Sequence, residues 1–298
     1  MKLFYAIIIS KQKGGLQVGY KILEKTELCP NQYELQIEAP FVTRNAKAGQ
    51  FIIFRVEEEG ERVPITIADV DKKNGVLTVV FMAVGYSTKK LAQLEKGDEI
   101  LDVVGPLGKP TEIEKYGTVV CIAGGYGAAP CFLISKAFKD AGNKVYTIMG
   151  ARNKDLIFWK DKMATACDEL FITTDDGTLG RKGFVTEVLA DIMEKEEVNY
   201  VIAVGPMPMM RAVANLTKEK GIKTEASMNP IMIDGTGMCG ACRVTVGGEV
   251  KFACIDGPDF DAHKIDFDEV INRTKIYKDE ERRRSESCNL LKQADSLR

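Results

Sequence analysis

The chain has 298 residues, of which 45% are hydrophobic and 28% are charged, and its formal net charge is -2. This length allows two or three domains of ordinary size, and the composition is that of a globular protein. The balanced charge gives no electrostatic reason for nucleic-acid binding, so no nucleic-acid partner is expected. The eight cysteines occur without a signal peptide, which indicates a reducing compartment, favours metal ligation over disulfides and predicts a cytoplasmic protein.

Residues 1–16 are predicted to form an N-terminal strand or tail. Their apolar run, residues 3–9, is too short to span a bilayer, and lysines follow it with no small-residue cleavage site. No other window reaches the length of a membrane helix. We therefore expect no membrane insertion and any membrane contact only through a partner.

Residues 17–110 are predicted to form an antiparallel β-barrel, because short runs of period-two alternation follow one another between turn residues. Two stretches in it suggest a ligand site: residues 62–66 (RVPIT) and residues 85–88 (GYST). The second is predicted to open a short helix with Ser87 or Thr88 as its N-cap, whose free N–H groups suit a pyrophosphate. An ordinary turn and an ordinary cap would have the same sequences.

Residues 111–225 have a different period and are predicted to form a parallel α/β domain. A buried strand, a glycine loop (GGYG, residues 124–127), a helix ending at a glycine cap and a second strand make a βαβ unit. Three further motifs, GARN, TDDG and GPMPM, each follow an apolar strand. Ligands bind beyond the carboxyl ends of parallel strands, so a nucleotide is expected there.

Residues 226–270 are predicted to form a small metal-binding lobe. Its loop reads Asp234-x4-Cys239-x2-Cys242-x11-Cys254, which is the spacing of a plant-type [2Fe–2S] loop with an aspartate in the first ligand position. The intervening glycines let backbone N–H groups approach bridging sulfides. A structural zinc site and a simple turn role for Asp234 are the alternatives.

Residues 271–298 are predicted to form a charged tail, either a solvated helical face or an extension that reaches a partner. Cys288 lies in this tail. His263, the single histidine, is interpreted as a surface or packing residue. Four other cysteines, in apolar or helical settings, are interpreted as packing residues: Cys29, Cys121, Cys131 and Cys167.

Taken together, these motifs and their order resemble the ferredoxin:NADP reductase superfamily over roughly residues 19–270. The added cysteine loop is similar to that of the dihydroorotate dehydrogenase electron-transfer subunit. With DGTGMCGAC in place of a four-cysteine loop, it looks most like the small (alpha) subunit of the electron-bifurcating NADH-dependent ferredoxin:NADP oxidoreductase and its sulfide dehydrogenase relatives.

The resemblance implies roles for individual residues. Those expected at FAD are Arg62, Pro64, Ile65, Thr66, Phe81, Met82, Gly85, Ser87 and Thr88. Those expected at NAD(H) are Gly124, Gly125, Gly127, Gly150, Arg152, Asp175, Asp176, Gly205, Met207 and Met209. Two positions depart from the family pattern, since Val63 stands where an arginine precedes the proline, and Val204 stands where many members have a cysteine. Asp175 and Asp176 predict a preference for NADH over NADPH, because carboxylates repel a 2′-phosphate.

The function implied is that of a flavin iron–sulfur oxidoreductase subunit in which electrons pass between NADH, FAD and a [2Fe–2S] cluster. A larger flavin/iron–sulfur subunit is the expected partner, in a heterodimer or larger assembly, and ferredoxin is expected to react only indirectly. The first alternative is service to dihydroorotate dehydrogenase. The second, from another class, is a zinc-stabilised binding module that senses nucleotides.

Overall fold

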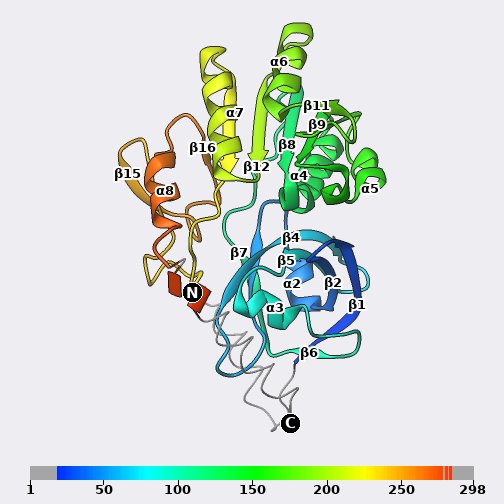
Figure 1. The fold of residues 1–298 in the computed structure, drawn as a ribbon, viewed down its shortest axis with the longest axis vertical. Coiled ribbons are helices and arrows are strands. Elements are labelled where there is room, and N and C mark those ends of the chain that lie inside the picture. The colour runs from blue at the N-terminus through cyan, green and yellow to red at the C-terminus, as the bar shows by residue number, and fades with distance from the viewer. Residues whose placement is uncertain (1–18, 278, 281, 284–298) are drawn as a thin grey trace.

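The computed structural model describes residues 19–277, 279–280 and 282–283, arranged in three parts (Figure 1). An antiparallel barrel is followed by a mostly parallel α/β sheet and then by a small C-terminal part with a two-stranded sheet. The predicted fold class is therefore confirmed. The strand or tail predicted for residues 1–16, Cys288 and most of the predicted tail lie outside the described residues. None of the described helices is both long and apolar enough to cross a membrane.

The barrel is a seven-stranded sheet in which every pair of neighbours is antiparallel. In spatial order its strands are β6 (Glu99–Ile100), β1 (Tyr20–Cys29), β2 (Gln32–Glu38), β5 (Val76–Met82), β4 (Val63–Asp71), β3 (Phe51–Arg55) and β7 (Asp102–Leu107). Alternate residues of these strands point inward and form one apolar core, as the period of two requires.

Two short helices belong to the barrel, α2 (Pro40–Asn45) and α3 (Tyr86–Leu91). The predicted N-cap of α3 is wrong, because Gly85 is the cap and the helix begins at Tyr86, two residues earlier than a cap at Ser87 would place it. Thr88 lies in the first turn instead, where its Oγ1 accepts hydrogen bonds from the N–H groups of Gly85 at 3.0 Å and Val84 at 3.1 Å. Its hydroxyl reaches back to the chain before the helix, which a cap residue does not do.

The second sheet also has seven strands. Their spatial order is β11 (Arg181–Lys182), β10 (Glu169–Thr174), β9 (Lys144–Ala151), β8 (Thr118–Gly124), β12 (Tyr200–Val204), β13 (Lys223–Ser227) and β16 (Asp259–Asp261). All pairs are parallel except β13 with β16. The strands predicted from the apolar runs before GARN, TDDG and GPMPM are confirmed.

Helices cover both faces of this sheet (Figure 1). One face packs on α4 (Ala128–Asp140) and α5 (Lys160–Thr165), and the other on α6 (Val185–Lys195) and α7 (Met207–Glu219). Two 3₁₀ turns, η1 (Gly125–Gly127) and η2 (Lys154–Leu156), precede α4 and α5. The glycine cap predicted after α4 is confirmed, since Gly142 follows it with φ 82°. All four cysteines predicted to be packing residues are buried in the core cluster to which α4 contributes.

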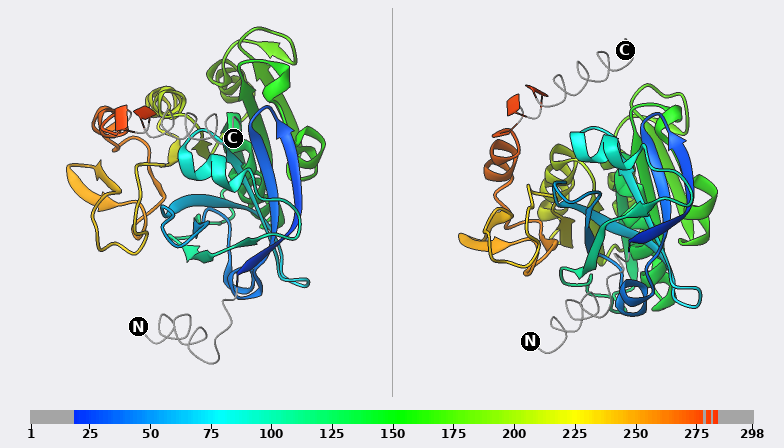
Figure 2. Two further views of the ribbon diagram at one scale, coloured as in Figure 1. Left: turned by 60° about the horizontal axis from the view of Figure 1, so that its bottom comes forward. Right: turned by 90° about the horizontal axis from the view of Figure 1, so that it is seen from below.

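The C-terminal part lies beside the barrel, on the side opposite β1 (Figure 2). It contains the hairpin β14 (Arg243–Val246) and β15 (Glu249–Phe252) and the helix α8 (Phe267–Arg273). Two glycines with positive φ, Gly247 and Gly248, form the hairpin turn, as a two-residue turn of this twist requires. The predicted division at residue 225 stays a prediction, and β13 runs across it.

Candidate functional site: three edges that meet beside one strand

The strand β4 presents the residues predicted to contact a flavin. Val63 and Ile65 pack toward the barrel core, so the alternation of the strand places Pro64 and Thr66 on its outer face, and both are half-buried. Arg62, directly before the strand, continues this outer series and is exposed. Further along β4, Ala68 packs in the same cluster as Ala128 and Ala129 of α4. The outer face of β4 therefore lies next to the nucleotide sheet.

The side chains of Ile65 and Phe81 are buried in the barrel core. Ile65 is 8% exposed and Phe81 4% exposed, and the Phe81 ring lies 5.8 Å from that of Tyr33. Met82, next to Phe81, is half-buried. Ile65 and Phe81 can therefore meet a ligand through their backbone, whereas Met82 offers its side chain.

At the start of α3, where a pyrophosphate is predicted to bind, a carboxylate occupies the hydrogen-bonding group of the helix. The hydroxyl of Ser87 is buried and donates a hydrogen bond to Oε2 of Glu61 at 2.7 Å. An anion at this helix start requires the Glu61 carboxylate to turn away, because two negative groups repel each other. Nothing in the sequence indicated this role of Glu61.

The residues predicted to bind a nucleotide are brought together by strand register. Gly124 on β8 lies beside Gly150 on β9, which lies beside Thr173 on β10. On the other side of β8, Ala123 is paired with Val204 on β12. The motifs that follow these strands therefore share the carboxyl edge of one sheet, as predicted.

Three of the predicted glycines have a packing reason that sequence reasoning missed. A Cβ on Gly124 would lie 2.5 Å from Sδ of Met209, and one on Gly127 would lie 2.3 Å from the carbonyl oxygen of Val204. A Cβ on Gly205 would lie 2.9 Å from Cα of Gly124. The loops after β8 and β12 can touch only because these positions lack side chains. Gly125, with φ 55°, has open space where its Cβ would be.

Arg152, Asp175 and Asp176 lie together at the outer part of this edge, and all three are exposed. The N–H of Asp176 donates to the carbonyl of Arg152 at 3.2 Å. Asp176 Oδ1 accepts from the hydroxyl of Thr178 at 2.7 Å and from its N–H at 2.9 Å, and these bonds lower the pKa of Asp176. The carboxylate of Asp175 has no such partner among the described residues.

The cysteine loop holds three thiols and one carboxylate. Cys242 and Cys254 are buried and Cys239 is exposed. Burial raises the pKa of Cys254 to about 12, with a further contribution from the adjacent Cys242 thiol. Within the described ranges, no three His, Cys, Asp or Glu side chains are gathered closely enough to hold a metal ion. Ligation therefore requires the side chains of this loop to move closer together.

The loop nevertheless fits an iron–sulfur cluster. The backbone N–H of Gly237 lowers the pKa of the Cys254 thiol against the effect of burial, and hydrogen bonds from backbone to ligand sulfur are typical of such clusters. Gly235, Gly237 and Gly240 have φ values of 78°, 86° and 66°, so the loop can wrap a bulky anion. Three thiolates with one carboxylate make a donor set that is mostly soft, which suits iron–sulfur centres and zinc.

Asp234 has one oxygen engaged. Its Oδ2 accepts from the N–H of Thr236 at 2.9 Å, from the Thr236 hydroxyl and from the N–H of Met238 at 3.4 Å. The Thr236 hydroxyl is the main cause of the lowered pKa of Asp234. Thr236 was not predicted, although a Thr two residues after an Asp is a recognisable turn pattern.

The cysteine loop lies against the barrel beside β4. Nη2 of Arg62 lies 3.4 Å from the carbonyl oxygen of Asp234 and donates to it. A Cβ on Gly235 would lie 2.3 Å from Cδ1 of Ile53 and 3.1 Å from Cδ1 of Leu107. Asn229 adds a contact to the nucleotide edge, donating through Nδ2 to the hydroxyl of Tyr126 at 2.9 Å, which no sequence signal indicated.

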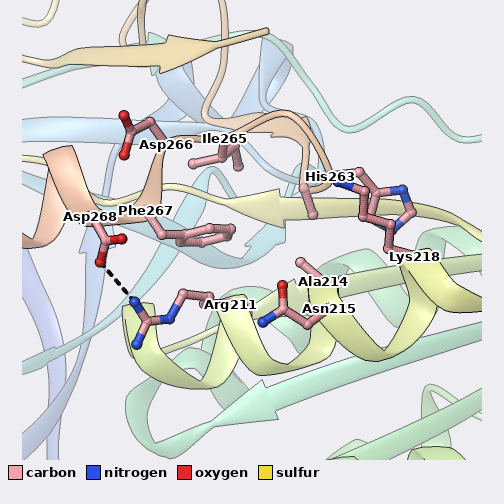
Figure 3. A pocket seen from close by; sticks show the side chains of 10 residues that line it. Arg211, Ala214, Asn215, Lys218, His263, Ile265, Asp266, Phe267 and Asp268 are labelled. Carbon is pink, nitrogen blue, oxygen red and sulfur yellow. Dashed lines mark hydrogen bonds and ion pairs between the residues drawn. The ribbon is translucent and has the colours of Figure 1, made fainter.

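A separate pocket lies between α7 and residues 262–268 (Figure 3). Arg211 and Asp268 form an ion pair of 2.8 Å beside it, and Nε2 of His263 lies 3.0 Å from the Thr217 hydroxyl. None of the predicted site residues lines this pocket.

Two family models match the chain. Residues 229–266 match the iron–sulfur cluster binding domain of dihydroorotate dehydrogenase B, and residues 121–215 match the oxidoreductase NAD-binding domain. These ranges contain the cysteine loop and the glycine-lined sheet edge.

Several known proteins are similar over most of their length. The dihydroorotate dehydrogenase B electron transfer subunit homolog of Thermotoga maritima is 43% identical, with 90% of this chain and 95% of the relative covered. An uncharacterized protein in the adh 3′ region of Clostridium beijerinckii is 49% identical, with 88% and 92% covered. The solved structure of an NADH-dependent reduced ferredoxin-NADP oxidoreductase, a flavin-based electron-bifurcating enzyme, contains a chain that is 41% identical, with 92% of this chain and 99% of that chain covered and a TM-score of 0.87.

Proposed function

The chain belongs to the family of dihydroorotate dehydrogenase B electron-transfer subunits and their homologues, and from this premise we propose that it is the small subunit of an NADH-dependent ferredoxin:NADP oxidoreductase. It carries electrons between NAD(H), FAD and a [2Fe–2S] cluster. The similarity to a chain of the bifurcating enzyme over nearly the whole length supports this choice within the family.

The observation that carries the proposal is that the nucleotide sheet and the cysteine loop both lie against β4, the strand predicted to contact the flavin. Its outer face lies next to α4 of the nucleotide sheet, and the cysteine loop reaches its first residues through Arg62. When bound, FAD supplies the conversion between hydride transfer and one-electron steps. The chain contributes position, because it holds the candidate sites of the three groups against one another.

Individual predicted site residues then have roles to be tested. The outer face of β4 and the start of α3 hold the flavin, with Arg62, Pro64 and Thr66 along the ring and Gly85, Ser87 and Thr88 at the pyrophosphate. The edge formed by the β8 and β12 loops holds the nucleotide. Asp175 selects NADH. The cluster ligands are Asp234, Cys239, Cys242 and Cys254.

Electrons leave through the surface around Cys239. Three apolar side chains of the same lobe are exposed there: Ile233 at 51%, Met238 at 88% and Ile255 at 43%. An exposed apolar group over a redox site is typical of a protein interface. A larger subunit with its own flavin and iron–sulfur groups covers it, in a cytoplasmic heterodimer or larger assembly, and ferredoxin reacts with that subunit.

Spectroscopy and activity of the isolated chain test the proposal. Purified protein should show flavin and iron–sulfur absorbance, give an EPR signal after NADH addition and reduce a one-electron dye with NADH. It should fail to reduce ferredoxin, because a low-potential acceptor requires a second, coupled acceptor. Zinc alone without flavin, or an unaided monomer that reduces ferredoxin from NADH, contradicts the proposal.

Service to a dihydroorotate dehydrogenase is the second candidate. The match of residues 229–266 to the iron–sulfur domain of that enzyme favours it. Identification of the subunit that co-purifies with the chain from its native cell separates the two, since a dihydroorotate-oxidising partner supports the second candidate only.

A further inference from the structure

We propose that Arg62 is a positioning residue that holds the cluster loop against the flavin strand and, through its charge, sets the reduction potentials of both centres. This inference rests on the proposed function, because it presumes that the cluster and FAD are bound. Arg62 would connect the candidate cluster site with the candidate flavin site.

The first step is the placement of Arg62. Val63, in the next position, packs toward the barrel core, so a cation there would be buried without a partner. Arg62 is on the opposite side of the chain, in the same outer series as Pro64 and Thr66. Arg62 therefore places a positive charge beside the candidate flavin site, although it lies one residue before the position of the arginine in the family pattern.

The second step is the contact that this placement allows. The Arg62 guanidinium donates to the carbonyl oxygen of Asp234, 172 residues away in sequence. A second contact fixes the same loop, because Gly235 lies directly on the Ile53 side chain, and Ile53 is the cross-strand partner of Pro64. The first residues of the cluster loop are thus attached to β3 and to the residue that precedes β4.

The third step is electrostatic. A fixed positive charge favours the state of a nearby redox centre that carries more negative charge, so it raises the reduction potential. One exposed charge close to a redox centre changes its redox equilibrium by about threefold to tenfold after solvent screening. Because Arg62 lies between the two candidate sites, its removal should lower both potentials.

Redox titration of the full-length holoprotein tests this. Arg62→Gln removes the charge and keeps a polar side chain, and Arg62→Lys keeps the charge without the guanidinium fork. Arg44→Gln, at an exposed arginine of α2, is the matched control for loss of one positive charge. The cluster is followed by EPR and the flavin by visible absorbance, with iron, sulfide and FAD contents measured in each variant.

The expected result is a shift of both midpoints to lower potential in Arg62→Gln, where tenfold corresponds to about 59 mV for a one-electron couple. Arg62→Lys should restore most of the shift, and Arg44→Gln should match the wild type. Unchanged midpoints in an Arg62→Gln protein with full cofactor content overturn the inference. If Arg62→Gln loses its cofactors, the Arg62→Lys protein gives the answer. Wild-type midpoint potentials in that protein support the role of charge. Midpoints lowered by an amount that corresponds to a threefold to tenfold change overturn the inference. Wild-type protein without flavin or cluster would contradict the proposed function instead.

Discussion

Thr236 donates two hydrogen bonds to one oxygen of Asp234, from its hydroxyl and from its N–H at 2.9 Å. These bonds engage Oδ2 within the loop, so Oδ1 is the oxygen that ligation of a cluster would use. The same pair of residues gives a turn its ordinary geometry, so both roles of Asp234 are open to experiment.

The Asp234 carboxylate is predicted to ligate the cluster. Asp234→Cys should retain the cluster with an altered midpoint potential, because a soft thiolate replaces a hard oxygen donor. Asp234→Ala should lose most of its iron and sulfide during purification. Iron and sulfide analysis with EPR of the reduced protein measures both, and an alanine variant with the wild-type spectrum and content would show that Asp234 is only a turn residue.

The Thr236 hydroxyl is predicted to orient that carboxylate. Thr236→Val removes the hydroxyl at constant shape and should accelerate cluster loss to a chelator by about tenfold, the lower range for partners of metal ligands. Thr236→Ser keeps the hydroxyl and is the control. Equal loss rates for the Val and Ser variants would contradict the prediction.

Asp175 is predicted to select NADH, since its carboxylate is exposed and lacks a partner in the described part of the chain, whereas Asp176 is bound by Thr178. Asp175→Asn should narrow the preference for NADH over NADPH by roughly 1–3 kcal/mol in kcat/KM. Asp161→Asn, an equal charge change at an exposed site in α5, should leave the preference as in wild type. A wild-type enzyme that uses NADPH equally well would show the assignment to be wrong.

Gly205→Ala should destabilise the fold by about 1–3 kcal/mol, because its Cβ would press on the Gly124 backbone rather than on a movable side chain. Gly85→Ala is the control, since its Cβ would approach Thr88 Oγ1 no closer than 3.9 Å and the change at this N-cap should cost less than about 1 kcal/mol. Denaturant unfolding gives both values. Similar midpoints for the two variants would contradict the close packing of the β8 and β12 loops.

Asp259 gives a pH-dependent prediction. Burial raises its pKa to about 6, with a smaller rise from Glu225, although the Thr111 and Ser227 hydroxyls oppose this. The folded state then binds more protons than the unfolded state between about pH 4 and pH 6, so stability falls as pH rises through this range. Asp259→Asn should remove up to about 3 kcal/mol of this loss. Unfolding of both proteins at pH 4 and 7.5 measures it, and a constant difference between them contradicts the prediction.

The two large sheets, and the shared carboxyl edge of the nucleotide sheet, could be predicted because the periodicity of apolar residues along short segments indicates strands. The apolar run before Gly124 and the one before Gly205 each had to be a buried strand, and parallel strands align their carboxyl ends. The role of Gly205 in loop packing had no such signal, because it depends on Gly124, which lies far away in the sequence. The Arg62–Asp234 contact was unpredictable for the same reason, and the N-cap of α3 was misplaced because Thr88 fits a cap or a first-turn position equally well by composition.

The short strand β16 pairs with β13 at the border of the nucleotide sheet. A chain shortened to end before Asp259 would expose a row of unpaired N–H and C=O groups along β13, a template for pairing with other molecules. The cluster lobe thus also protects the nucleotide sheet from aggregation, and separating the two by proteolysis or by expression of fragments should yield insoluble nucleotide-binding halves.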